Sequence, residues 1–306
     1  MDGESVLVVG SGAMACLFAA QLAGVADVTL LGSWPEGMAA IRRNGIRVER
    51  NGESTTVPVN LASHPEEVVG ARHALVLVKS WQTAEAARKL KRCLAPDGLA
   101  MTLQNGLGNL EILEQALGPQ CSAQGVTMRG ATLLGPGHIR WGGSGPTFLA
   151  RHPRIGGLEQ TLRQAGFDPQ VEDDVQAVVW GKLAINAGIN PLAALLRLRN
   201  GELLDRPEAR ALMESAAAEV QAIASGLGIS LPYPDAAIRV VEVAGQTAEN
   251  ISSMLQDIRR GAPTEIDAIN GAVAQCARQS GRSAPVNETL WRLVRAAVSV
   301  EKGAGR

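Results

Sequence analysis

The first half of the chain alternates short, continuous apolar runs with stretches of helical spacing. Runs that are apolar at every position are typical of strands covered on both faces, as in a parallel sheet between helices. Four such runs lie at residues 5–9, 27–31, 74–78 and 99–103, with helices expected up to residue 23 and at 84–94. The glycine-rich stretch 130–150 indicates hairpins. We therefore predict a doubly wound α/β sheet for this half.

After about residue 172 the strand-like runs end and only helical spacing remains. The predicted helices cover residues 177–189, 209–225, 234–250, 265–280 and 287–300. The chain is thus predicted to combine an α/β domain at 1–172 with an all-α, helical domain at 173–306.

The charge balance limits the classes of partner. The 306 residues carry 29 Lys and Arg against 30 Asp and Glu, a net charge of -1, which favours neither nucleic acid nor an anionic membrane. No uninterrupted apolar run approaches the roughly 18 residues of a membrane span, and the first residues do not open a signal peptide. We expect a cytoplasmic protein without a nucleic-acid or membrane partner; a homodimer through the helical half is left open.

Cysteine and histidine spacing argues against a metal centre. The four cysteines form no CxxC pair, and the four histidines show neither HxxxH nor HExxH spacing, so we expect no bound metal. Lysine is scarce, with five among the 29 basic residues, and only Lys79 and Lys182 stand in apolar surroundings. These two lysines are therefore candidates for chemistry.

A glycine motif follows the first predicted strand and opens a helix. Its residues are Gly10, Ser11, Gly12, Ala13, Met14 and Ala15, which fit G-x-G-x-x-G/A. Such a motif provides a tight turn, close backbone approach to a pyrophosphate and a small residue where helix meets strand. The context favours dinucleotide binding over a plain glycine turn.

The end of the second strand bears on the choice between NAD and NADP. An acidic residue there would bond the ribose 2′-hydroxyl and repel a 2′-phosphate, and the sequence Gly32-Ser33-Trp34 has none. Its absence favours NADP. Ser33 with Arg42 or Arg43 could supply a hydrogen bond and positive charge; alternatively, both arginines are solvated helix residues.

Polar residues at two strand ends and on one helix form the other candidates. Lys79 and Asn105 follow predicted strands, at the edge where open α/β sheets bind ligands, although a lysine there can also be a solubilising terminus. Lys182, Asn186 and Asn190 lie at i, i+4 and i+8 on an otherwise apolar helix, which favours a face turned to a ligand over a solvated face.

The remaining polar candidates come later in the helical half. Asn250 and Ser253 repeat the pattern at i and i+3. Glu265 would occupy the first turn of the helix that follows, where an acid can also simply complement the helix dipole.

Taken in order, these segments resemble the ketopantoate reductase (2-dehydropantoate 2-reductase) family over nearly the whole chain. The matching segments are the glycine motif, Val78-Lys79-Ser80-Trp81-Gln82, Gln104-Asn105-Gly106-Leu107-Gly108, Trp180-x-Lys182-Leu183-x-x-Asn186-x-x-x-Asn190-Pro191, Asn200-Gly201-Glu202-Leu203, Asn250 to Asp257, and Thr264-Glu265-Ile266-Asp267-x-x-Asn270-Gly271. The resemblance implies NADPH-dependent reduction of 2-dehydropantoate to (R)-pantoate, toward pantothenate and coenzyme A, in a cleft between a Rossmann domain and a helical domain. Family members often carry an arginine after the second strand, where this chain has Gly32-Ser33-Trp34.

The resemblance also implies a role for each candidate. Lys182 would be the general acid that protonates the substrate C2 oxygen, and Glu265 would complete the polar network around it. Lys79 and Asn105 would lie beside the nicotinamide and the substrate. The substrate-binding residues would be Asn105, Asn186, Asn190, Asn200, Asn250 and Ser253.

Two other functions stay open at this point. One is reduction of another small 2-oxo acid on the same scaffold. The other is a catalytically idle dinucleotide-binding module, against which the presence of both Lys182 and Glu265 argues.

Overall fold

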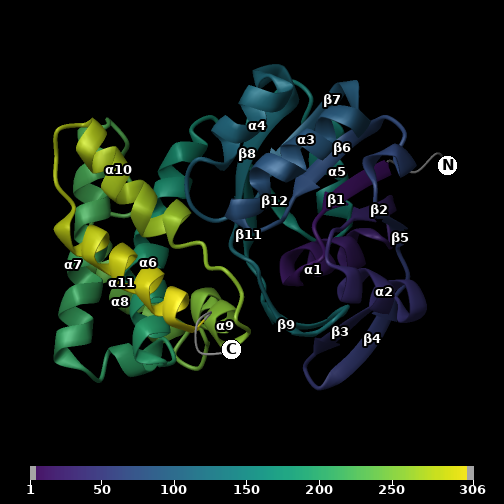
Figure 1. The fold of residues 1–306 in the computed structure, drawn as a ribbon. Helices are drawn as coiled ribbons and strands as arrows, with labels where there is room; N and C mark the ends of the chain where they lie inside the picture. The colour runs from purple at the N-terminus through teal and green to yellow at the C-terminus, as the bar shows by residue number, and fades with distance from the viewer. Residues whose placement is uncertain (1–4, 302–306) are drawn as a thin grey trace. The chain divides into compact units, whose positions relative to one another are not determined.

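The computed structural model describes residues 5–301 and divides the chain into two units (Figure 1). The first, here called the N-terminal unit, comprises Met1–Gln104 and Asn109–Val175. The second, the helical unit, comprises Gln176–Arg306 together with the short segment Asn105–Gly108. The predicted fold class, an α/β sheet followed by helices, is confirmed.

The N-terminal unit is built on an eight-stranded sheet of order β12-β11-β8-β7-β6-β1-β2-β5, in which all neighbours are parallel except β8 and β11. The strands are β1 (Ser5–Val9), β2 (Asp27–Leu31), β5 (Asn60–Ala62), β6 (Ala71–Val76), β7 (Leu94–Thr102), β8 (Ser122–Thr127), β11 (Pro146–Ala150) and β12 (Asp168–Glu172). The chain winds outward from β1 to β2 and β5, then returns beside β1 as β6. Ligands of open α/β sheets bind at the carboxyl ends of the strands that flank such a reversal.

Helices on both faces explain why the strands are apolar at every position. Val6 and Val8 of β1 pack into a core with α1 and α5, whereas Leu7 and Val9 pack into a second core with α3 and α4. The helices of this unit are α1 (Ala13–Leu22), α2 (Pro35–Asn44), α3 (Thr83–Cys93), α4 (Asn109–Leu117) and α5 (Gly156–Gln164).

A second, four-stranded sheet of order β4-β3-β10-β9 belongs to the same unit. Its strands are β3 (Ile46–Arg50), β4 (Glu53–Val57), β9 (Gly130–Gly135) and β10 (His138–Gly143). The glycine-rich stretch thus forms one hairpin, β9–β10, as predicted, but β11 joins the large sheet. The sequence analysis did not include β3 and β4, which are only five residues long; β3 alternates buried and exposed positions, and β4 is mostly exposed and polar.

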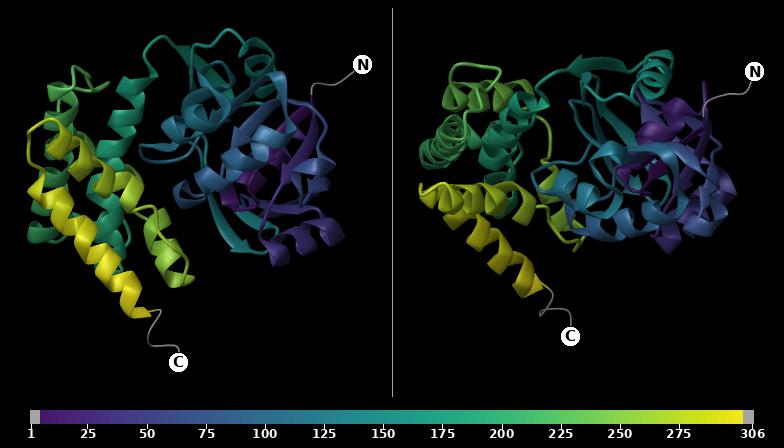
Figure 2. Two further views of the ribbon diagram at one scale, coloured as in Figure 1. Left: turned by 45° about the horizontal axis from the view of Figure 1, so that its top comes forward. Right: turned by 90° about the horizontal axis from the view of Figure 1, so that it is seen from above.

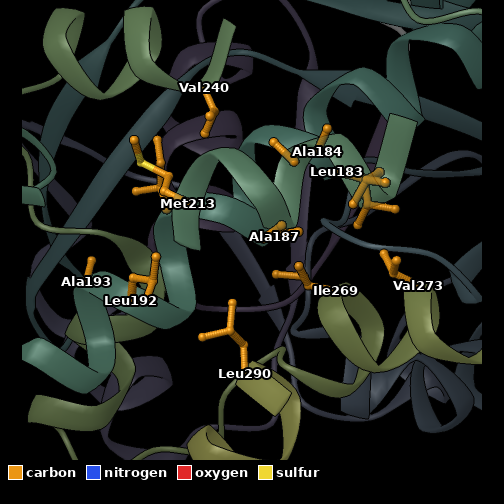
Figure 3. Packing of buried hydrophobic residues seen from close by; sticks show 14 of the residues in the cluster. Leu183, Ala184, Ala187, Leu192, Ala193, Met213, Val240, Ile269, Val273 and Leu290 are labelled. Carbon is orange, nitrogen blue, oxygen red and sulfur yellow. The ribbon is translucent and has the colours of Figure 1, made fainter. Parts of the chain in front are cut away.

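The helical unit packs around α6 (Val175–Leu196). Figure 3 shows Leu183 and Ala187 of α6 among apolar side chains from other helices, including Met213, Val240 and Leu290. Helix α11 lies beside α7 and α10 (Figure 2). The other helices are α7 (Pro207–Gly226), α8 (Ala236–Gln246), α9 (Ser253–Arg259), α10 (Ala272–Gln279) and α11 (Pro285–Glu301).

Helix α6 is, by length and composition, long and apolar enough to cross a membrane, with 22 residues and a mean hydropathy of 1.2 in its most apolar window. The sequence contains no uninterrupted apolar run of this length, because Lys182, Asn186 and Asn190 interrupt it. In the structure 72% of that window is buried, as in the core helix of a bundle.

Several predicted boundaries shift in the structure. Strand β6 ends at Val76, so Lys79 lies three residues beyond it, and α6 continues through Pro191. The predicted helix at 265–280 consists of a π-helical turn, η5 (Asp267–Gly271), followed by α10. Asn250 precedes α9 instead of lying on a helix, because Ser252 caps α9 by accepting a hydrogen bond from the Leu255 N–H at 3.2 Å.

Candidate active site

The first turn after β1 can only be made by glycine. Gly10 has φ +129°, and a Cβ there would lie 3.2 Å from the Leu77 carbonyl and 3.3 Å from the Ala15 Cβ. Ala15 is fully buried, so a larger side chain would not fit between β1 and α1. These two residues therefore fill the tight-turn and close-packing positions of a dinucleotide-binding motif.

Gly12 takes the remaining position of the motif, where the backbone approaches the pyrophosphate closely. It is exposed, with ordinary φ of -82°, and no atom lies within 4 Å of a Cβ placed on it. It precedes α1, whose N-terminus has neither a side-chain cap nor an acid in its first turn. The uncapped N-terminus of α1 and the open space beside Gly12 fit a pyrophosphate.

The end of β2 lies against this glycine turn. The Gly10 N–H donates to the Leu31 carbonyl at 2.9 Å, and a Cβ on Gly32 would lie 3.0 Å from the Ser11 side chain. Ser33, the next residue, is exposed. This arrangement places Ser33 beside the glycine turn, just after the end of β2, where the adenosine ribose of a dinucleotide binds in such folds.

Arg42 and Arg43 lie at the other end of α2. Both are exposed residues of its last turn, about 10 to 12 Å along the helix axis from Pro35, the first residue of α2, at 1.5 Å per residue. The structure therefore favours the interpretation that they are solvated helix residues and complement the helix dipole.

Gln104, which was not among the candidate residues predicted from the sequence, joins the loops after β6 and β7. Gln104 Nε2 donates to the Val78 carbonyl at 3.0 Å and to Thr83 Oγ1 at 2.8 Å. Thr83 is fully buried and donates to the Ser80 carbonyl at 2.8 Å. Gln104 thereby holds the loop that carries Lys79, on the same sheet edge as Gly10. An amide at a strand end gives no distinctive sequence signal, because such residues are commonly solvated.

Lys182 is the titratable group with the most unusual environment among these candidates. Burial lowers its pKa from 10.5 to about 8, although part of its side chain stays accessible, and the Glu265 carboxylate opposes this shift. Glu265 is itself only 5% exposed. Lys182 therefore stays mainly protonated at pH 7, yet its pKa is close enough to neutrality for proton transfer.

Asn105 joins this pair through the short segment of the helical unit. Its Nδ2 lies 3.5 Å from Glu265 Oε2, a long contact, and the Leu107 N–H donates to the Ala268 carbonyl at 2.9 Å. Gly106 has φ +82° and lies so close to the Ala268 carbonyl that no Cβ would fit. The structure thus brings together three predicted residues, Asn105, Lys182 and Glu265.

Asn186 and Asn190 follow Lys182 on α6. Asn186 is half-buried and Asn190 is 6% exposed. Among the residues that the structure describes, neither side-chain amide has a hydrogen-bond partner. A polar ligand on this face of α6 would give both amides partners.

Asn200 and Asn250 form a second group. The Asn200 N–H donates to the Asn250 carbonyl at 3.0 Å, and Asn200 Nδ2 donates to Thr247 Oγ1 at 2.9 Å. Asn200 Oδ1 is buried without a partner in the described part of the chain, so it can accept a hydrogen bond from a ligand. Asn250 is exposed, and Ser253 is half-buried at the start of α9. Within residues 5–301 no hydrogen bond joins this group to Lys182 or Glu265.

Two cavities of the N-terminal unit lie away from these residues. One, of about 420 Å³, is lined by α1, β3, β4 and Trp141. The other, of about 490 Å³, lies beside His138. None of the predicted site residues lines either cavity.

Comparison with known proteins accounts for nearly the whole chain. Residues 6–154 match the family model "Ketopantoate reductase PanE/ApbA", and residues 174–298 match "Ketopantoate reductase PanE/ApbA C terminal". The 2-dehydropantoate 2-reductase of Archaeoglobus fulgidus is 36% identical over 99% of this chain and 100% of its own length. That of Halobacterium salinarum is 35% identical over 95% of this chain and 98% of its own.

Solved structures share the fold. A PanE/ApbA family ketopantoate reductase from Ralstonia eutropha has a TM-score of 0.90 and 32% identity, covering 97% of this chain and 99% of its own. D-mandelate dehydrogenase, solved with NADH and anilino(oxo)acetate, also has a TM-score of 0.90 and covers 97% of this chain and 98% of its own, but at 24% identity this likeness concerns the fold alone. Both matches extend over the N-terminal and the helical units. The chain therefore belongs to the ketopantoate reductase family.

Proposed function

We propose that this protein reduces 2-dehydropantoate to (R)-pantoate with NADPH, a step toward pantothenate and coenzyme A. The observation that carries the proposal is the buried Lys182 amine, with its pKa lowered to about 8 beside Glu265. The names of the relatives support the same substrate.

The reaction needs an acid at the oxygen that becomes negative. Bound NADPH supplies a hydride to the C2 carbon of the oxo acid. As C2 is reduced, its carbonyl oxygen acquires the charge of an alkoxide, which the Lys182 ammonium stabilises and protonates. Glu265 keeps this amine in its charged form, because a nearby carboxylate favours the ammonium.

The asparagines suit the rest of the substrate. A 2-oxo acid with a hydroxyl group presents a carboxylate and a polar oxygen, both of which neutral amide donors can bind without fixing a further charge. Asn186 and Asn190 extend the Lys182 face of α6, and the unpartnered Asn200 Oδ1 can accept from a hydroxyl. We assign substrate binding to these residues together with Asn105, Asn250 and Ser253.

The proposed cofactor rests on the N-terminal unit. The Gly10 turn, the open Gly12 and the uncapped α1 support a dinucleotide. The absence of an acid in Gly32-Ser33-Trp34 supports NADPH over NADH. Glu36, in the first turn of α2, is the nearest acid along the chain after Ser33, and it is the group to which we would attribute a preference for NADH.

Initial rates with the purified protein test the proposal. Ketopantoate with NADPH should give the highest kcat/KM in a panel that pairs both nicotinamides with ketopantoate, 2-oxoisovalerate and phenylglyoxylate. A higher kcat/KM with another oxo acid would assign the protein to that substrate. Tight NADPH binding without turnover of any member would make it a dinucleotide-binding module.

We also propose a cytoplasmic location, and a homodimer through the helical half stays an open prediction. Cell fractionation and the molar mass in solution test these two statements separately.

A further inference from the structure

Helix α6 contains a gap in its backbone hydrogen bonds at its centre. Pro191 lies inside the helix and has no N–H. The carbonyl that this N–H would have bonded, four residues earlier, belongs to Ala187. Ala187 is fully buried and packs near Ile269 (Figure 3), so water is not at hand to replace the missing donor.

Asn270 supplies the donor that Pro191 lacks. Its Nδ2 donates to the Ala187 carbonyl at 3.0 Å and also lies 2.9 Å from Asn287 Oδ1. The side chain is fully buried. An unpaired buried carbonyl is costly, so this single side chain allows α6 to continue through a proline.

The π-helical turn η5 determines where Asn270 lies. The Gly271 N–H donates to the Ile266 carbonyl, five residues earlier, at 3.0 Å, so the turn holds one residue more than an α-helix would. Trp291 Nε1 of α11 donates to Asp267 Oδ1 at 2.6 Å and fixes the start of this turn. The turn follows Glu265 directly, since the Ile269 N–H donates to the Glu265 carbonyl at 3.1 Å.

Asn287, the second acceptor of the Asn270 Nδ2 group, is itself held by α7, whereas Asn270 Oδ1 is buried without a partner in the described part of the chain. Asn287 Nδ2 donates to Glu219 Oε2 of α7 at 2.8 Å and to the Ala216 carbonyl at 3.0 Å. Glu219 also accepts the N–H groups of Val286 and Asn287 at 2.9 Å, so it caps the start of α11. Asn270 therefore connects the gap in α6 to a rigid network of α7 and α11.

We propose that Asn270 is a positioning residue that sets the Lys182 amine against the Glu265 carboxylate. Lys182 lies five residues before Ala187 on α6, and Glu265 lies five residues before Asn270. The bond between Asn270 and Ala187 thus joins the helix of the acid to the segment of its partner. This inference rests on the proposed function, and it adds a role for a residue that touches neither substrate nor cofactor.

A double-mutant cycle between Asn270 and Pro191 tests this role. Asn270→Ala should lower the melting temperature by about 5 °C, as expected for one unpaired buried carbonyl. It should lower kcat by about tenfold and shift the basic limb of kcat/KM toward lower pH by roughly 0.5 unit, because Glu265 moves away from the amine. Pro191→Ala restores a backbone donor for Ala187, so in that background each effect of Asn270→Ala should shrink several-fold.

The outcomes separate the parts of the inference. If Asn270→Ala alone does not fold, we predict that the double variant Asn270→Ala/Pro191→Ala does. A double variant that is as unfolded as Asn270→Ala would contradict the coupling. Equal effects in both backgrounds would show that Asn270 does not replace the proline N–H. A lower melting temperature with unchanged kcat and pH limb would refute positioning.

Glu219→Gln is the matched control, because it weakens the same network without touching Ala187. It should lower the melting temperature and leave the pH limb in place; a shifted limb would contradict the assignment to Asn270. Wild-type protein that does not reduce ketopantoate would refute the proposed function, while the melting temperatures would still test the bond between Asn270 and Ala187.

Discussion

Replacing Lys182 by Met removes the proposed general acid and keeps most of its apolar stem. The amine stands in a setting that lowers its pKa to about 8, and its loss removes the proposed proton donor to the forming alkoxide. A positioned general acid contributes roughly 10² to 10⁴ in rate, which corresponds to about 3 to 5 kcal/mol. We therefore expect kcat for ketopantoate to fall by that factor in Lys182→Met.

The same variant should stay folded. Because burial lowers the pKa of Lys182, the fold disfavours its charged form, and an apolar side chain removes that penalty. The melting temperature at pH 7 should be unchanged or higher. Any gain should shrink as the pH rises from about 8 toward 10.5, where wild-type Lys182 is neutral in the fold and then in the unfolded chain.

The assay compares NADPH oxidation by wild type, Lys182→Met and a matched control, Lys89→Met. Lys89 lies on α3 and forms an i,i+4 ion pair with Glu85 at 3.1 Å, so its loss should leave kcat unchanged and cost less than about 1 kcal/mol of stability. NADPH affinity should be the same in all three proteins. A folded Lys182→Met variant with kcat within a factor of a few of wild type would refute the assignment, and Lys79 would be the next candidate.

Three further predictions concern Glu265, the glycine turn, and the pair Asn250 and Ser253. Glu265→Gln should move the basic limb of kcat/KM to lower pH, because the carboxylate raises the pKa of Lys182. A pH–rate profile whose basic limb does not move would show that Glu265 does not act on the Lys182 amine. Gly12→Val should abolish NADPH binding in a fluorescence titration, with little change in melting temperature because the space beside Gly12 is open. Gly10→Ala should lower the melting temperature, because Gly10 has a φ of +129°. Asn250→Ala or Ser253→Ala should raise KM for ketopantoate about tenfold with NADPH affinity unchanged; weaker NADPH binding would place these residues at the cofactor.

The fold class was predictable because its signals are local. Apolar strands such as Ser5–Val9, the glycine turn and helical spacing each depend on neighbouring residues. The small sheet was not predictable in this way, since β3 pairs with β10 across about ninety residues and neither strand is uniformly apolar. Likewise, nothing near Asn105 in the sequence shows that its short segment joins the helical unit through the Ala268 carbonyl.

The candidate site was predictable in part for a related reason. Lys182 stood out because a lysine on an apolar helix conflicts with its surroundings, and such conflicts concentrate at functional sites. Asn270 and Gln104 act through bonds to backbone carbonyls far along the chain, at Ala187 and Val78. Their roles follow from a proline gap and a loop that only the three-dimensional structure brings beside them.

The pH dependence of kcat/KM for ketopantoate reduction by the wild-type protein tests the central assignment most directly. This ratio reports the free enzyme, in which burial places the pKa of Lys182 at about 8. Reduction needs the protonated amine, so kcat/KM should be level below about pH 7.5 and fall tenfold per unit above about pH 8.5. A profile that stays level to pH 10, or rises through this range, would contradict Lys182 as the general acid.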